Sequence, residues 1–389
     1  MKQPKLCRAV LAIALPALAL TQVPASPNTG SDEDRDDRLQ AVGEEGGPRR
    51  RLEGIEARSW RAGREIFLRK FEPRAGLGPS FNAESCATCH SEPAIGGAGG
   101  LEFNVGGGRP GVVGYDLRTR PPELTRPARR RPVMKGCPDP RPRTAGVQTP
   151  SILGLGLIET IPEGEILARE DPHDRDRDGV RGVASRVEVD RGYVEIGRFG
   201  WRAQAPRLQD FVRGACGGEL GLTVPDGLRG FGQIEDADRV PDPELIWQEV
   251  DELSFYCREL APPPRGGRAG EPEVRRGEAL FTTVGCAVCH VPSLHGSDGP
   301  VPLYSDLLLH VVVEDAGSGG SGDDAGPVGI RTPPLWGIGK TAPYLHDGRA
   351  EDLTAAIEGH GGEALRARAA WQALNEADRE ALLAFLMDL

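Results

Sequence analysis

The motif Cys86-Ala87-Thr88-Cys89-His90 occurs a second time as Cys286-Ala287-Val288-Cys289-His290, two hundred positions further along the chain. Two cysteines separated by two residues can form thioether bonds with both vinyl groups of one porphyrin, and the histidine that follows can bind its iron. A single copy would also suit half a zinc site or a redox dithiol, but zinc needs a second pair of ligands nearby, and the other cysteines are not spaced as such a pair. The repeat therefore predicts two covalently bound haem c groups, held by Cys86, Cys89 and His90 and by Cys286, Cys289 and His290.

Length and composition favour two domains with long irregular connections. A chain of 389 residues exceeds the usual size of one domain, and the two motifs lie far enough apart for one in each. Hydrophobic residues make up only 38% of the chain, whereas it contains 53 glycines and 34 prolines, a composition typical of extensive loops. Two buried porphyrins would supply apolar mass that the sequence lacks.

The first 25 residues are typical of a secretory signal peptide. Lys2 and Lys5 precede an apolar run from residue 9 to residue 20, and Val23-Pro24-Ala25 offers a cleavage site. An uncleaved anchor is the alternative, although this run is short for crossing a bilayer and no later segment is long enough. We therefore expect an exported protein, periplasmic or secreted, with no membrane span after cleavage. Export also agrees with the haem motifs, because bacteria attach haem c outside the cytoplasm.

The net charge limits the choice of partner. The chain carries a formal charge of −11 at pH 7, and loss of Lys2, Lys5 and Arg8 with the signal would make it more negative still. Such an acidic surface argues against nucleic acid or anionic lipid. It favours a small, soluble, basic electron-donor protein.

Repeated features divide the rest of the chain. Residues 26–52 are rich in charge and glycine with almost no apolar residues, which predicts a disordered tether. Two cytochrome c-like domains are expected at 53–261 and 271–389, joined by a linker at 262–270 that is rich first in proline and then in glycine. Each would contain an entry helix with Gly-x-x-[Ile/Leu]-Phe, a haem motif, a Thr-Pro turn and a terminal amphipathic helix, which indicates tandem duplication. The matching segments are 63–67 and 277–281, 149–156 and 332–339, and 245–260 and 376–389.

Three cysteines lie outside both the motifs and the signal. In an oxidising compartment two of Cys137, Cys216 and Cys257 could form a disulfide and leave one over. A single buried thiol is an equal alternative. The sequence does not select a pair.

Further motifs give the chain a family resemblance. Together with the two haem motifs and the Thr-Pro-x-x-x-Gly of each half, Ala342-Pro343-Tyr344-Leu345-His346-Asp347-Gly348-Arg349 resembles the bacterial dihaem cytochrome c peroxidase and MauG superfamily. The segments 156–159, 196–201 and 303–310 narrow the resemblance to its dihaem oxidoreductase branch. The resemblance covers about residues 55–389. It implies two mainly helical domains with one haem each, of which one reacts with peroxide and the other relays electrons.

The resemblance also implies roles for four residues. Relatives of the peroxidase type place a distal ligand of the second haem fourteen positions after the histidine of Pro-Tyr-x-His, which is His360 here. Met or Tyr is usual there, so His360 would give this haem two histidine ligands and a lower potential, unless it merely ends a helix. For proton transfer at the first haem, relatives use a Gln and, ten positions later, a Glu, which correspond to Gln209 and Glu219, although Glu219 could equally be an ordinary loop residue. Trp201 falls near the place where relatives set a Trp between the haems, or is simply a large buried aromatic.

Two further groups are candidate metal ligands. Asp174, Asp176 and Asp178 alternate along the chain with a glycine at the sixth place, as in the first half of a calcium loop, but the twelfth position is not Glu. Because relatives bind calcium between domains, we weigh a Ca²⁺ site against a solvated acidic turn. His310 is a weaker iron-ligand candidate, since the Asp-Met-Gly usual after it in this branch is replaced by Val311-Val312-Val313.

The sequence therefore predicts an exported dihaem peroxidase-like oxidoreductase. Electrons would enter at the His290 haem, cross by way of Trp201 and reduce peroxide at the His90 haem, which has no distal histidine at the usual spacing, while Glu219 moves protons. The alternatives are a non-catalytic electron carrier or redox sensor with both irons six-coordinate, and a MauG-like oxidase of another substrate.

Overall fold

Helices dominate the computed structural model, which describes residues 41–78, 81–99, 148–190, 192–236, 238–313 and 329–389. The α-helices are α1 (Gly54–Leu68), α2 (Cys86–Cys89), α3 (Leu155–Glu159), α4 (Glu163–Leu167), α5 (Leu208–Ala215), α6 (Trp247–Glu259), α7 (Pro272–Val284), α8 (Leu353–Glu358), α9 (Leu365–Ala373) and α10 (Glu376–Asp388). Shorter turns are η2 (Pro73–Ala75), the π-helical η6 (Cys216–Leu220), η7 (Cys286–Val288), η8 (Ile338–Lys340) and η9 (Gly362–Ala364). The mainly α fold class is confirmed.

Three small antiparallel sheets complete the described structure. Each has two strands: β1 (Arg186–Asp190) with β2 (Tyr193–Ile196), β3 (Leu294–Gly296) with β4 (Gly299–Val301), and β5 (Leu309–His310) with β6 (Ile330–Arg331). None of the helices in the described ranges is long and apolar enough to span a bilayer. The predicted signal peptide, residues 1–25, and Cys137 lie outside the described residues.

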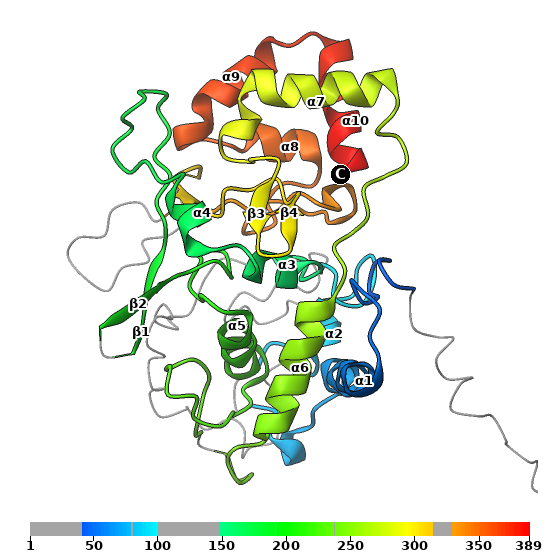
Figure 1. Cartoon of the computed structure of the whole chain (residues 1–389), viewed down its shortest axis with the longest axis vertical. Coiled ribbons are helices and arrows are strands. Elements are labelled where there is room, and N and C mark those ends of the chain that lie inside the picture. The colour runs from blue at the N-terminus through cyan, green and yellow to red at the C-terminus, as the bar shows by residue number, and fades with distance from the viewer. Residues whose placement is uncertain (1–40, 79–80, 100–147, 191, 237, 314–328) are drawn as a thin grey trace, which may run out of the picture. The chain divides into compact units, whose positions relative to one another are not determined.

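The first helix pair, α1 and α6, meets at Gly63. A Cβ atom built at Gly63 would lie 2.0 Å from the backbone oxygen of Glu252, so only glycine allows this approach. Beside it, the ring of Tyr256 packs on Trp60 and Phe67, with centroids 4.6 and 5.2 Å away. Figure 1 shows this pair next to α2, which carries the first haem motif.

The second helix pair, α7 and α10, repeats the same contact at Gly277. A Cβ atom there would lie 1.9 Å from the backbone oxygen of Ala381. Phe281 and Phe385 stack edge to face beside it at 5.3 Å. Helix α7 then ends at Gly285, whose φ of 101° turns the chain directly into the second haem motif. The two glycines occupy the same place in the sequence repeat, which therefore corresponds to two similar helix pairs (Figure 1).

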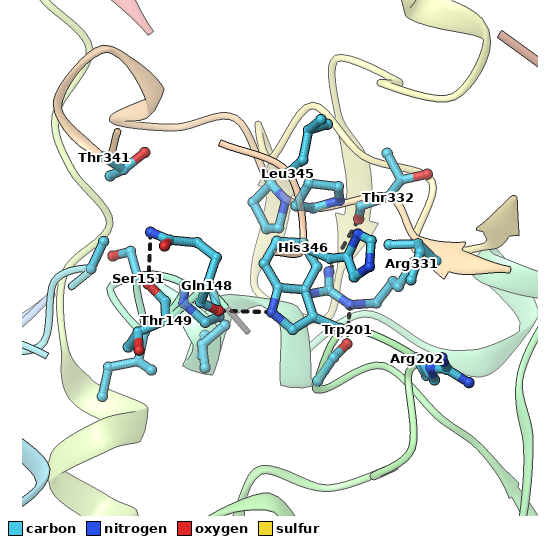
Figure 2. Close-up of a pocket in the computed structure, with 18 of the residues that line it drawn as sticks. Gln148, Thr149, Ser151, Trp201, Arg202, Arg331, Thr332, Thr341, Leu345 and His346 are labelled. Atoms are coloured by element: carbon cyan, nitrogen blue, oxygen red, sulfur yellow. Dashed lines mark hydrogen bonds between the residues drawn. The ribbon is translucent and has the colours of Figure 1, made fainter. Parts of the chain in front are cut away.

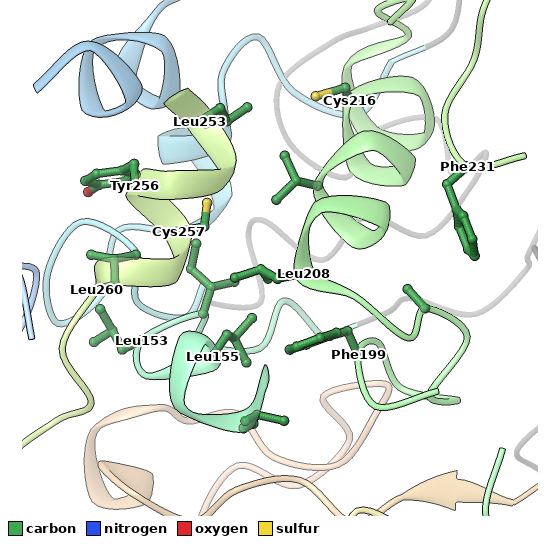
Figure 3. Close-up of a cluster of buried hydrophobic side chains, with 14 of the residues drawn as sticks. Leu153, Leu155, Phe199, Leu208, Cys216, Phe231, Leu253, Tyr256, Cys257 and Leu260 are labelled. Atoms are coloured by element: carbon green, nitrogen blue, oxygen red, sulfur yellow. The ribbon is translucent and has the colours of Figure 1, made fainter. Parts of the chain in front are cut away.

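The larger hydrophobic core crosses the expected domain boundary. Figure 3 shows its centre, where Leu153, Leu208 and Leu253 converge from separate segments. Leu303 and Trp336, which come from the predicted second domain, belong to the same core. All described residues form one compact unit, so packing does not stop at the predicted linker.

The folded chain begins before residue 52, where the tether was expected to end. The backbone N–H of Ala261 donates to Gly47 at 2.9 Å, and that of Arg49 donates to Glu259 at 2.7 Å. The Arg49 side chain also pairs with the buried Glu259 carboxylate. Gly47 and Arg49, which lie within the predicted tether, are therefore held by backbone bonds to Ala261 and Glu259.

Candidate functional site

Both haem motifs line one cavity of about 1950 Å³. Pockets for a single small ligand usually span about 300–1000 Å³, so this one can hold more than one large cofactor. Its wall is mostly apolar and includes all six motif side chains: Cys86, Cys89, His90, Cys286, Cys289 and His290.

The first motif forms the single turn of α2. The hydroxyl of Ser85 caps this turn by accepting from the backbone N–H of Thr88 at 3.2 Å. The thiol of Cys89 is not in a disulfide, and burial followed by the charge of Glu219 raises its pKa to about 12. His90 bonds the backbone oxygen of Gly97 through Nδ1 at 3.1 Å, and burial lowers its pKa.

The second motif repeats this arrangement. His290 bonds the backbone oxygen of Tyr304 through Nδ1 at 2.9 Å. Burial lowers the pKa of His290 to about 4 and raises that of the Cys286 thiol to about 11. Both motif histidines are therefore neutral at pH 7 and keep Nε2 for a metal.

These donor sets fit a covalently attached haem better than zinc. Zinc needs a compact set of about four ligands, whereas both motifs face one large and mostly apolar cavity. Burial raises the pKa values of the Cys86, Cys89 and Cys286 thiols. Each motif instead presents two reduced thiols and one oriented neutral imidazole to an apolar cavity, as a c-type haem requires.

His360 lies on the side of the second motif. It follows helix α8, lines the cavity and bonds the backbone oxygen of Ala356 through Nδ1 at 2.7 Å, so its Nε2 is also left over. Burial lowers the pKa of His360. The pKa of His290 is lowered by burial and, to a smaller extent, by the charge of His360, so the two imidazoles are near each other. The position suits a second axial ligand of the same iron.

Glu219 lies on the side of the first motif. It belongs to the π-helical turn that continues α5, a type of turn often found at functional sites. Its exposed carboxylate lines the cavity, accepts from Asn82 Nδ2 at 2.5 Å and raises the pKa values of Cys86 and Cys89. A carboxylate there can exchange protons with a small molecule bound near the first motif.

Gln209 does not accompany Glu219. Its amide donates to Asp251 on α6 at 2.6 Å, and it is not part of the cavity wall. The cavity wall includes the α5 residues Leu208, Asp210, Phe211, Val212, Gly214 and Ala215, but not Gln209. Gln209 therefore does not line the cavity in this structure, and its role beside the first haem stays a prediction.

Trp201 lies within the cavity wall beside residues from both halves of the chain. Its indole N–H donates to the backbone oxygen of Gln148 at 2.9 Å, and the backbone oxygen of Trp201 accepts from the backbone N–H of Arg331 at 2.8 Å. The ring meets His346 edge on, with centroids 6.5 Å apart. Figure 2 shows these side chains together.

His310 is not available as an iron ligand. Its Nε2 bonds Asp306 at 2.8 Å and its Nδ1 bonds Glu363 at 3.1 Å, so both ring nitrogens are occupied. Burial would lower its pKa, but bonds to Asp306, Cys289 and Glu363 raise it to about 12. His310 is a buried imidazolium held between carboxylates, which corrects its candidacy as a ligand.

The other predicted groups include Asp178, Cys216 and Cys257, which also line the cavity. Asp174, Asp176 and Asp178 bring carboxylate oxygens within 4.8 Å of one another, as a cation site requires, but they also cap turns of their own loop. Cys216 and Cys257 are both buried free thiols, and the described cysteines form no disulfide.

Sequence reasoning missed Gln148, Arg331 and His346 as part of the cavity. Gln148 and Arg331 each precede the Thr-Pro of one half, so the repeat itself contained a signal for them. His346 lies in the Pro-Tyr-x-His motif, which was used for counting to His360 only.

The solved structures that resemble this chain include two with low sequence identity. Hydrazine synthase of Kuenenia stuttgartiensis has 17% identity and a TM-score of 0.40, with all of both chains covered. A MauG-like protein associated with microbial copper homeostasis has 22% identity and a TM-score of 0.26, covering 36% of this chain and 52% of that one. Neither score establishes a common fold. No curated protein sequence matches the chain.

A family model matches the larger part of the chain, but the first haem motif lies outside the match. It matches residues 143–389, which include the second haem motif, Trp201, Glu219 and His360. The match spans more than half of the chain. The chain therefore belongs to the family described as di-haem oxidoreductase, putative peroxidase.

Proposed function

We propose that this protein is an exported c-type cytochrome with two covalently attached haems that works as a peroxidase-like oxidoreductase. The observation that carries the proposal is the single cavity lined by both Cys-x-x-Cys-His motifs. The two sides of this cavity offer different chemistry: a histidine, His360, beside His290, and a carboxylate, Glu219, beside Cys89. Such asymmetry suits one iron that passes electrons and one that meets a substrate.

Reduction of hydrogen peroxide to two waters takes up two electrons and two protons. A haem bound at each motif would supply the iron that exchanges the electrons. Glu219 would hold and return a proton at its carboxylate, with Asn82 orienting that group. Trp201 would lie on the path between the two haems, with its indole fixed by Gln148.

Electrons would enter at the second haem. His360 and His290 would close both axial positions of its iron, which favours electron transfer over substrate binding. The negative charge of the chain favours a basic donor protein that is small and soluble. The proposal also includes two tandem domains, 53–261 and 271–389, and a periplasmic or secreted location after loss of residues 1–25. It includes a calcium ion bound by Asp174, Asp176 and Asp178.

The test combines a spectrum with one substitution. The oxidised holoprotein should contain two haems and show one high-spin and one low-spin iron. Glu219→Gln should keep both haems but lower peroxide turnover by about 10²-fold or more. Glu188→Gln, which alters an exposed carboxylate on β1, is the control and should leave turnover unchanged. Unchanged turnover in Glu219→Gln would remove Glu219 from the mechanism.

The competing function is electron transfer or redox sensing without catalysis. It would require a protein ligand at both axial positions of both irons. Low-spin spectra in every redox state, with no peroxide turnover, would favour it. A long-lived oxidised species after peroxide addition would instead favour a MauG-like oxidase of another substrate.

A further inference from the structure

The cavity wall contains a buried arginine that has no carboxylate partner among the described residues. Arg331, at the end of β6, is only 5% exposed and lines the cavity. Its guanidinium donates from Nε to the backbone oxygen of Gly200 at 2.9 Å and from Nη1 to that of Thr332 at 3.1 Å. Both acceptors are neutral carbonyl groups, so the positive charge is oriented but not balanced.

Nearby carboxylates are already engaged. Asp306 is the acidic residue whose charge reaches Arg331, and its Oδ2 bonds the imidazolium of His310 at 2.8 Å. Across the described ranges, no carboxylate lies within ion-pair distance of Arg331. Burial lowers the pKa of Arg331 to about 10, which leaves the side chain charged at pH 7. A buried cation of this kind is costly unless an anion joins it.

We propose that Arg331 binds a carboxylate group of a haem. A guanidinium presents parallel N–H donors that match a carboxylate, and two of its contacts already fix the direction of the fork. A porphyrin that is attached through its vinyl groups to a motif at the cavity wall carries its two carboxylates on the other side of the ring. These carboxylates are therefore the anions that the family's cofactor brings into this cavity. The inference rests on haem binding and not on peroxide chemistry.

The sequence repeat makes this site specific to one half of the chain. Arg331 precedes Thr332-Pro333, and the corresponding residue of the first half is Gln148, which precedes Thr149-Pro150. Gln148 is equally buried, but it is neutral and its amide donates to Gly99 at 2.9 Å. Arg331 would thus neutralise one haem carboxylate, whereas Gln148, at the corresponding position of the first half, would neutralise none. The backbone N–H of Arg331 also donates to the backbone oxygen of Trp201, so Arg331 would link the anchored haem to the backbone of that tryptophan.

Potentiometric titration of both haems in the holoprotein tests the proposal. Removing a cation near a haem stabilises its oxidised form, so Arg331→Gln should shift one of the two potentials to a more negative value. Arg331→Lys keeps the charge and should keep both potentials close to wild type. Arg366→Gln is the matched control, because Arg366 lines the same cavity but is exposed and should shift neither potential. Two bound haems with wild-type potentials in Arg331→Gln would overturn the proposal, as would an equal shift in Arg366→Gln.

Two further arms separate the remaining explanations. If Arg331 instead held a free small carboxylate, the wild-type potentials would change when acetate is added to the dialysed protein, whereas a haem carboxylate predicts no change. If Arg331→Gln does not retain both haems, resonance Raman spectra of Arg331→Lys should show altered haem carboxylate bands, and unchanged bands would overturn the proposal. No arm uses peroxide, so failure here and failure of the proposed peroxidase activity are told apart.

Discussion

Replacing Gly277 by alanine should destabilise the protein by separating α7 from α10. The added Cβ would lie 1.9 Å from the backbone oxygen of Ala381 and 2.7 Å from the Cβ of Phe385. Ordinary contact begins near 3.4 Å, so the helices would have to move apart by roughly 1.5 Å at this point. The obstacle is backbone rather than a flexible side chain, and it cannot rotate away.

The expected loss follows from two opposing effects. Overpacking of a close contact costs about 1–3 kcal/mol, whereas alanine in a helix is favoured over glycine by about 0.5–1 kcal/mol. Because a backbone atom of α10 must move, we expect overpacking to prevail, with a net loss of about 2 kcal/mol. The displacement should also reach the second haem, since α7 continues through Gly285 into Cys286.

Urea denaturation followed by far-ultraviolet circular dichroism measures this loss. Gly164→Ala is the control, because Gly164 lies in α4 with open space around its Cβ position and should be slightly stabilised. The optical spectrum of the second haem should broaden in Gly277→Ala only. If Gly277→Ala were as stable as wild type while Gly164→Ala behaved as expected, the close approach of α7 and α10 would not be a real constraint.

Two further substitutions test the site and the electrostatics. His360→Ala should convert the low-spin haem to high-spin, which optical and electron paramagnetic resonance spectra would detect. His173→Ala, which changes an exposed histidine, is the control and should not alter the spectra. An unchanged spectrum in His360→Ala means that another residue is the ligand. Asp236→Asn should stabilise the protein above neutral pH, because burial, followed by the charges of Asp238 and Glu244, raises the pKa of Asp236 from 3.8 to about 7. Because its pKa is higher in the folded than in the unfolded protein, the Asp236 carboxyl group lowers the stability of the protein as the pH rises from about 4 to about 7. The gain in melting temperature of Asp236→Asn should therefore grow from pH 4 to pH 7 and then level off. A gain that is independent of pH would contradict this reasoning.

The helix pairs were predictable because each depends on a short local pattern. Gly63 and Gly277 open two copies of Gly-x-x-[Ile/Leu]-Phe, and the terminal helices expected at 245–260 and 376–389 are found at Trp247–Glu259 and Glu376–Asp388. The boundary between the halves was not predictable in the same way. Trp336 reaches the first core through long-range packing against Gly154, which no local pattern records.

Of the site residues that were predicted by counting positions from a motif, some line the cavity and one does not. His360 and Glu219 both line the cavity, whereas Gln209 points to α6 because one residue of helix changes direction by about 100°. A spacing carries over between proteins only if the secondary structure between the two residues is the same, and here Glu219 lies within the π-helical turn η6. His310 was misjudged for another reason: its partner Glu363 lies 53 positions away in sequence.

The difference between a peroxidase and an electron carrier comes down to what faces the first haem. Among the cavity-lining histidines, His310 is occupied by two carboxylates, His360 lies near His290, and His346 lies edge on to Trp201. Beside the first motif lie Glu219, a carboxylate held by an amide donor, and the buried thiols of Cys216 and Cys257. A carboxylate in that position serves proton transfer better than strong ligation of a c-type haem iron, which favours imidazole or thioether ligands. The proposed peroxidase activity therefore depends on Glu219 facing a first haem that is open to a small oxidant.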